Sequence, residues 1–328
     1  MIKEKKMLNK FIGFMLCVML VVSFSAVPSE ASYNGKKVLF IDSYHEGYAW
    51  SDGITKGVKS VVDGKGMNLK VVRMDTKRNT SEDFKKEAAL KMKAVIDDFK
   101  PDVVIASDDN ASKYLIEPYF KGSSLPFVFC GVNWDASGYG FPTSNVTGMI
   151  EVTPVPQLLE QLKPYAKGNR IGFLGPDILT AKKEAENYKK VFGMNLTEYY
   201  AKDFEDWKKG FKELQKSVDI LLIDSDGGLY NDKASEMKSF VEANTTVPTG
   251  TAYDFMASYA LLDFAKVAEE QGSWAADAAL KILDGTSPSN IPVSKNKEGK
   301  LIINMRIAKT LGVDIPFDFI QSASQVIE

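Results

Sequence analysis

The sequence has few of the side chains that serve redox, metal or acid–base chemistry. It contains 2 cysteines and 1 histidine in 328 residues. Cys17 lies in an N-terminal apolar run, so Cys130 has no partner for an internal disulfide in the rest of the chain. His45 has no cysteine near it, and the Cys/His spacing of a zinc site and the Gly-rich phosphate loop are both missing. We therefore expect no metal, no cofactor and no enzymatic activity.

An excess of charge of one sign is also missing. The 41 basic and 43 acidic residues leave a net charge of -2. Such a balance gives no field that would hold nucleic acid or an anionic membrane. We expect no nucleic-acid partner.

Long apolar runs are scarce as well. The run from Phe11 to Val22 is shorter than the roughly 20 apolar residues needed to span a bilayer. Lysines precede it, and the small residues Ser29 and Ala31 follow, which is typical of a secretory signal peptide. The sequence predicts a signal peptide over residues 1–31 and a protein secreted across the inner membrane, periplasmic or otherwise extracytoplasmic.

The remaining chain alternates short apolar runs with segments of helical period. Runs at 38–41, 69–74, 103–105 and 127–129 alternate with predicted helices at 51–62, 81–99 and 111–119. Continuous apolar strands of this kind are typical of a parallel sheet that is buried on both faces. The first half is predicted to be an α/β lobe.

The second half repeats this order. Residues 169–174 (NRIGFL) match 36–41 (KKVLFI), residues 218–227 (VDILLIDSDG) match 101–110 (PDVVIASDDN), and 247–251 match 125–129. Helices are predicted at 182–192 and 205–217. Matched strand starts in one order indicate a second, equivalent lobe.

Three segments could pass between the lobes. The Pro- and Gly-containing stretch 141–156 is the first, the run 258–264 could cross back, and the tail from Ile291 could return to the second lobe. We therefore expect a first lobe of 36–147 plus 258–288, a second of 148–257 plus 289–328, and a ligand cleft between them. Closure about this three-strand hinge is the favoured interpretation; two rigid domains with a fixed interface are the alternative.

Residues that follow each predicted strand are the candidates for ligand binding, because ligands of open α/β sheets sit at the carboxyl ends of strands. Aromatic faces and carboxylates together suit a ligand with an ammonium group, and main-chain amides of the helix after Tyr48 could hold a carboxylate. The same aspartates could instead cap helices, the aromatics could be core residues, and the cysteine could be buried. The candidates are Ser43, Tyr44, Tyr48, Trp50, Asp108, Asp109, Cys130, Asn133, Trp134, Asp177, Asp226, Tyr253 and Asp254.

Three segments resemble a known family: VLFIDSYHEGYAWSDGITKG (38–57), VTGMIEVTP (146–154) and KLIINMRIAKTLGVDIP (300–316). They are similar to ABC-transporter substrate-binding proteins of the type I periplasmic fold, a family that includes tryptophan-binding members. The resemblance implies two Rossmann-like lobes with parallel sheets, three hinge strands, a small-molecule ligand, delivery to a membrane ABC permease, and a monomer. It also implies that the cleft is lined at Ser43, Tyr44, Asp108, Cys130, Asn133, Asp226 and Tyr253.

Two other functions stay open. The same module resembles the extracytoplasmic sensor portions of some signalling kinases, so the chain could present its ligand to a membrane kinase or chemoreceptor. An exported hydrolase on this scaffold is favoured only by His45 and the aspartates.

Overall fold

The computed structural model describes residues 33–79, 81–225 and 233–328. The expected signal peptide and Asp226 lie outside these residues. Within them, no helix has the length and apolar character required to cross a membrane.

The first sheet is entirely parallel, as its continuous apolar strands predict. Its strand order is β11-β5-β4-β3-β1-β2. Alternate residues of a strand point to opposite faces, so Val38 and Phe40 pack into one core while Leu39 and Ile41 pack into another. The strands are β1 (Lys37–Asp42), β2 (Asn68–Arg73), β3 (Val103–Ser107), β4 (Phe127–Asn133), β5 (Val146–Glu151) and β11 (Ser294–Lys295).

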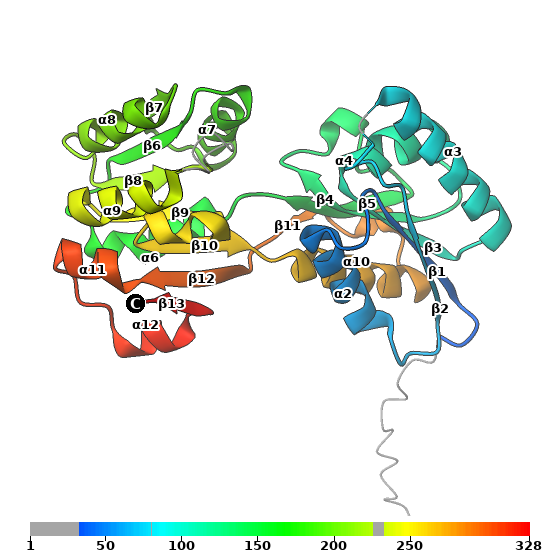
Figure 1. The fold of residues 1–328 in the computed structure, drawn as a ribbon. Helices are drawn as coiled ribbons and strands as arrows, with labels where there is room; N and C mark the ends of the chain where they lie inside the picture. The colour runs from blue at the N-terminus through cyan, green and yellow to red at the C-terminus, as the bar shows by residue number, and fades with distance from the viewer. Residues whose placement is uncertain (1–32, 80, 226–232) are drawn as a thin grey trace, which may run out of the picture.

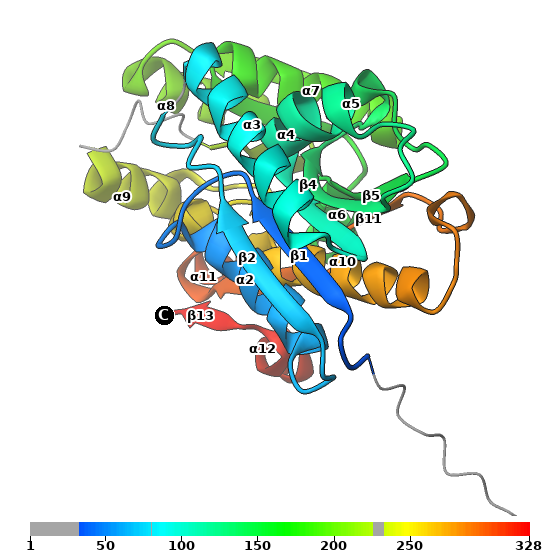
Figure 2. The same ribbon diagram turned by 90° about the vertical axis from the view of Figure 1, so that its right-hand side faces the viewer.

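Helices cover both faces of this sheet. On one face lie α2 (Ala49–Val62) and α10 (Ala268–Leu283). On the other lie α3 (Glu82–Phe99), α4 (Asp108–Ala111), the π-helix Ser112–Ile116 and α5 (Glu117–Tyr119). The first lobe is thus a three-layer α/β unit (Figure 2).

The second sheet is mostly parallel and has the order β13-β12-β10-β9-β8-β6-β7. The β10–β12 pair is antiparallel. The strands are β6 (Ile171–Pro176), β7 (Leu196–Ala201), β8 (Ile220–Ile223), β9 (Thr249–Thr251), β10 (Leu262–Lys266), β12 (Gly299–Asn304) and β13 (Gln325–Ile327). The helices are α6 (Val155–Leu162), α7 (Leu179–Phe192), α8 (Phe204–Leu214), α9 (Ala234–Asn244), α11 (Met305–Leu311) and α12 (Phe317–Ser322).

The predicted repeat is present in three dimensions. The order β2-β1-β3-β4-β5 in one sheet matches β7-β6-β8-β9-β10 in the other. A detail of the matched sequences also repeats: the Asp102 carboxylate accepts a hydrogen bond from Lys37 N (2.7 Å), and that of Asp219 accepts one from Arg170 N (2.9 Å). Each aspartate fixes the start of a central strand to its neighbour, so the two lobes are built alike.

Three segments join the lobes, and they fall partly at other positions than expected (Figure 1). The chain crosses after β5, after β10 and between β11 and β12. The expected boundaries at 258 and 289 are wrong, because β10 pairs with β9 and β12 in the second sheet and β11 pairs with β5 in the first. An apolar run fits either sheet equally well, so its pairing partner decides its lobe.

Glycines allow α10 to pack tightly on the first lobe. A Cβ on Gly57 of α2 would lie 2.1 Å from Glu269 O, and one on Gly272 of α10 would lie 2.0 Å from Ile54 O. Only residues without a Cβ permit helix backbones to approach this closely. The contact holds α10 beside α2 (Figure 2), although more than 200 residues separate the two helices in the sequence.

Candidate functional site

A cleft of about 790 Å³ opens between the lobes. The first lobe contributes the loops after β1 and β2, the starts of α2 and α10 and the ends of β3 to β5. The second lobe contributes the residues after β9, the end of β10 and Lys300 of β12. Of the predicted site residues, Tyr44, Tyr48, Trp50, Asp108, Asn133, Tyr253 and Asp254 line this cleft. These residues come from strand ends, where the sequence predicts the site.

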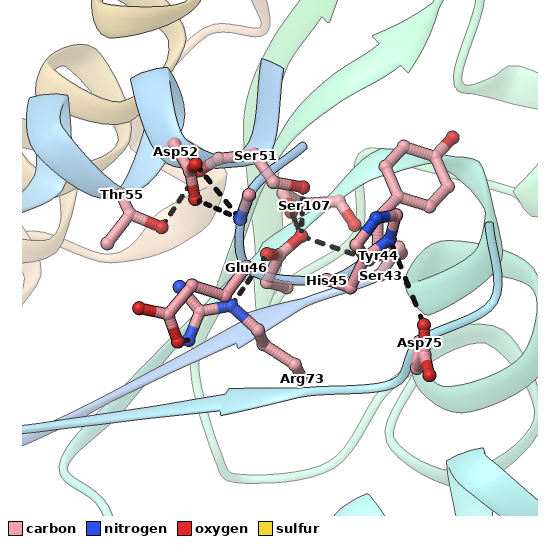
Figure 3. Close-up of polar contacts among 12 residues, drawn as sticks. Ser43, Tyr44, His45, Glu46, Ser51, Asp52, Thr55, Arg73, Asp75 and Ser107 are labelled. Carbon is pink, nitrogen blue, oxygen red and sulfur yellow. Dashed lines mark hydrogen bonds and ion pairs between the residues drawn. The ribbon is translucent and has the colours of Figure 1, made fainter. Parts of the chain in front are cut away.

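The loop after β1 is held by a buried carboxylate (Figure 3). Oδ1 of Asp42 accepts hydrogen bonds from Ser51 Oγ (2.8 Å) and from Tyr44 N (3.0 Å), and Arg73 Nε lies 3.4 Å from Oδ2. Asp42 is fully buried, so these partners are needed to offset its desolvation. The network fixes the start of α2 and leaves the ring of Tyr44 clear of it (Figure 3).

Asp108 combines burial, a left-handed backbone and a carboxylate oxygen without a partner. It is 2% exposed, its φ is 69°, and its Oδ2 has no hydrogen-bond partner, although it lines the cleft. Burial raises its pKa well above the usual range, and the carboxylates of Glu151, Asp42 and Asp109 add to the effect. A buried carboxylate without a partner can accept a donor from a ligand.

Two tyrosine rings lie beside Asp108 and face a lysine. Tyr44 and Tyr48 meet edge to face at 5.5 Å, and Lys77 Nζ lies 5.1 Å and 5.0 Å from their ring centroids. Burial raises the pKa of Tyr44, and Asp108 raises it further, so its hydroxyl keeps its proton and remains a donor. The first lobe therefore offers aromatic faces in the same cleft as the buried Asp108 carboxyl group.

Two charged residues that line the cleft form an ion pair. The carboxylate of Glu151, at the end of β5, pairs with Nζ of Lys266, at the end of β10. Burial works against the charge of Lys266, but Glu151 and Glu184 outweigh it and raise the lysine pKa. Nζ of Lys266 also lies 5.6 Å from the ring centroid of Trp50. The pair thus joins two of the segments that connect the lobes.

The second lobe faces the cleft with a partly buried tyrosine that is paired with a buried aspartate. Tyr253 lines the cleft, and its hydroxyl is hydrogen bonded to Asp224 behind it. Burial raises the pKa of Asp224 to about 7, and the nearby Glu184 contributes. Asp224 follows β8, where the repeat puts it at the position of Ser107 in the first lobe.

Ser43, Asp109, Cys130 and Asp177 do not line the cleft, and the first two hold loops in place. Asp109 accepts hydrogen bonds from Asn133 Nδ2 (2.7 Å) and the Tyr139 hydroxyl (2.8 Å). Ser43 Oγ donates to Ser107 O and accepts from Ala111 N. Cys130 is fully buried in the core beneath α2 and α10, Asp177 pairs with Lys182 at the start of α7, and Asp226 lies outside the described residues.

Trp134 likewise does not line the cleft, because it spans the two lobes. Its ring packs against Tyr188 (5.8 Å) and Phe192 (5.9 Å) of α7, and its Nε1 donates to Glu184 (3.1 Å). Thr153, on the first crossing segment, donates to the same carboxylate (2.5 Å). Trp134 therefore fastens the first lobe to the second beside the hinge.

Charged residues of the cleft were missed by the strand-end rule. Lys77 follows β2, whose end gave no candidate in the sequence, and Glu151 lies within the stretch 141–156 that was expected to cross between the lobes. Lys266 lies two residues beyond the run expected to cross back.

Among the described residues, no three His, Cys, Asp or Glu side chains come together as metal ligands.

The fold and the cleft agree with a known family. A model of the family described as "ABC transporter substrate binding protein" matches residues 43–327. The chain therefore belongs to the ABC transporter substrate-binding protein family, whose members bind a small molecule and work with a membrane permease. No curated protein sequence matches the chain.

Solved structures share the fold at low identity. A ligand-free, open substrate-binding protein with adhesive properties from Clostridium difficile is 22% identical, with a TM-score of 0.67 over 89% of this chain and 99% of that one. An ABC domain in complex with L-Trp from Streptococcus pneumonia is 20% identical (TM-score 0.52, 89% and 99%). A periplasmic ribose ABC transporter from Conexibacter woesei is 15% identical (TM-score 0.55, 87% and 98%). These likenesses show the type I periplasmic-binding fold.

Proposed function

We propose that the cleft captures a small metabolite that carries an ammonium group and an apolar or aromatic body, for example an amino acid, and that the protein delivers it to an ABC importer. The observation that supports this ligand class is the buried carboxyl group of Asp108, whose Oδ2 lacks a hydrogen-bond partner and which lines the same cleft as the rings of Tyr44 and Tyr48. An ammonium satisfies both features, because it donates to a carboxylate and is attracted to aromatic faces.

A carboxylate on the same ligand would find donors elsewhere in the cleft. Ala49 and Trp50 begin α2 and line the cleft. The first N–H groups of a helix have no partner within the helix, and the helix dipole favours an anion there. A zwitterion could therefore bridge Asp108 and the start of α2.

Export and closure complete the proposed cycle. Residues 1–31 have the pattern of a secretory signal peptide, which would direct the chain out of the cytoplasm. Glu151 and Lys266 lie at the start of two segments between the lobes, where a hinge motion would turn, and Trp134 contacts the second lobe nearby. A monomer that closes on its ligand would present both lobes to the permease.

The test is a ligand screen followed by one matched pair of variants. The purified protein is screened with amino acids, biogenic amines and sugars by thermal shift, and hits are measured by calorimetry. A ligand at 100 times its Kd should stabilise the protein by roughly 2.7 kcal/mol. A screen in which only sugars or only anions bind would contradict the proposed ligand class.

Asp108→Asn then tests the anchor. Asparagine tolerates the left-handed backbone of Asp108 (φ 69°), so the variant should fold. Loss of a charge-assisted hydrogen bond should weaken an ammonium ligand by about 10- to 100-fold. Asp177→Asn is the matched control, because Asp177 is a strand-end aspartate paired with Lys182 outside the cleft, and its affinity should equal wild type. Equal affinities of both variants would refute the assignment of Asp108.

A further inference from the structure

Lys77 lies where the ammonium group of the proposed ligand would lie. Its Nζ is within 5.1 Å of both ring centroids, Tyr44 and Tyr48, and both distances fall inside the roughly 6 Å range of cation–π attraction. Lys77 lines the same cleft as Asp108, and its positive charge acts against the raised pKa of that carboxylate, which burial dominates. The two rings thus face a cation that the chain itself supplies, in the same cleft as the Asp108 carboxyl group.

The backbone that carries Lys77 is fixed. Asp75 N donates to Tyr44 O (2.8 Å), and Thr76 donates to Ser43 O through both its N (3.0 Å) and its Oγ1 (2.6 Å). Asn110 Nδ2 donates to Thr76 Oγ1 (2.8 Å). The loop after β2 is therefore hydrogen bonded to the loop after β1, which holds the backbone of Lys77 beside the two rings.

The side chain itself is free to leave. Lys77 is exposed, and no hydrogen bond or ion pair of its Nζ is found among residues 33–79, 81–225 and 233–328. The cleft contains a contrasting lysine, Lys266, whose Nζ is paired with the buried carboxylate of Glu151. A flexible lysine with a strongly hydrated head can move into water at little cost.

We propose that Lys77 is a tethered occupant of the ammonium subsite, and that a cationic ligand binds by displacing its side chain from the Tyr44–Tyr48 cage. The proposal rests on the proposed function, since it concerns the same cleft and ligand class. Lys77 then acts as a specificity residue: a neutral ligand cannot replace the charge that it removes from beside Asp108, whereas an ammonium can.

If the ligand displaces Lys77, a substitution of this cleft residue should raise the affinity for a cation, not lower it. Lys77→Met removes the competing cation and should tighten binding of a cation by about 3- to 30-fold, which is the range that cation–π energies correspond to. A lysine that held a ligand carboxylate would give the opposite result, a loss of affinity in Lys77→Met.

The probe is choline, and its neutral isostere 3,3-dimethylbutan-1-ol is the comparison. Both are titrated by calorimetry into the full chain, into Lys77→Met and into Lys113→Met. Lys113 is the matched control, because its Nζ lies 4.9 Å from the ring centroid of Tyr114, it is exposed, and it does not line the cleft. Choline should bind Lys77→Met more tightly than wild type, and Lys113→Met should match wild type.

A second measurement follows the lysine itself. Lysines labelled as ¹³C-dimethylamines keep their charge, and the signal absent from Lys77→Arg identifies Lys77. In the ligand-free protein its methyl signal should be shifted upfield by the two rings, and saturating choline, but not the isostere, should move it to the position of solvent-exposed lysines.

Four results would overturn the proposal: an unshifted Lys77 signal, no choline binding to wild type or Lys77→Met, equal or weaker choline binding in Lys77→Met, or tightening by the isostere as well. If the ligand screen finds an amine while Lys77→Met does not tighten choline, the proposed function stands and the displacement fails. If no amine binds any form of the protein, both fail.

Discussion

The ion pair between Glu151 and Lys266 should couple the two crossing strands energetically. Its carboxylate side chain is 8% exposed and its lysine side chain 22%. Removing one partner of a buried pair costs about 3–5 kcal/mol, because the other charge stays buried without compensation. The partial exposure of Lys266 lowers the expected cost of Lys266→Met to about 2–3 kcal/mol. Glu151→Gln should cost less, since its amide oxygen can still accept from Nζ.

Urea unfolding of the two single variants and of the double variant measures the coupling between them. We expect a coupling energy of about 1–3 kcal/mol, with the double variant more stable than the sum of the single losses predicts. The surface pair Lys93–Asp97, four residues apart on α3 and exposed at both ends, is the control and should give at most about 0.5 kcal/mol in the same cycle. A coupling for Glu151 and Lys266 no larger than that of the control would refute the assignment of a buried pair whose two charges compensate each other.

Two further variants test the packing and the pH dependence of the lobes. Gly57→Ala should lower the free energy of unfolding by roughly 2 kcal/mol or more, because its Cβ would lie 2.1 Å from Glu269 O, whereas Gly138→Ala, with no atom within 4 Å, should be neutral in the same urea assay. Burial raises the pKa of Asp263 to about 8, and Asp254 adds to this, so the folded protein keeps a proton that the unfolded chain loses, and stability falls between about pH 4 and pH 8. The free energy of unfolding of Asp263→Asn relative to that of wild type should therefore rise by a few kcal/mol between pH 5 and pH 8.5. A difference between the two proteins' melting curves that does not change with pH would contradict the raised pKa.

The interior strands could be predicted because their signal is local. The apolar runs before Asp42, Ser107 and Asp224 are continuous, and each is a buried strand of its sheet. β7 and α9 were not predicted: β7 is an edge strand of mixed burial (LTEYYA), so it lacks both a continuous apolar run and a full alternation.

The site could be predicted in part, for a reason that lies in topology. Strand-end residues such as Tyr44 and Tyr253 line the cleft because parallel strands end at one edge of each sheet. Trp134 obeys the same rule but reaches past the cleft to α7. Lys77 and Lys266 carry no pattern that distinguishes them from solvated surface lysines.

The sequence by itself determined the order of elements, the two equivalent lobes and the ends at which a ligand would lie, because periodicity and repetition are properties of neighbouring residues. Tertiary structure alone decided which lobe β10 joins and which charges meet in the cleft. Glu151 and Lys266 are 115 residues apart, and Lys77 reaches the rings of Tyr44 and Tyr48 only because β2 lies beside β1. Such contacts depend on pairing between distant strands, which no local pattern records.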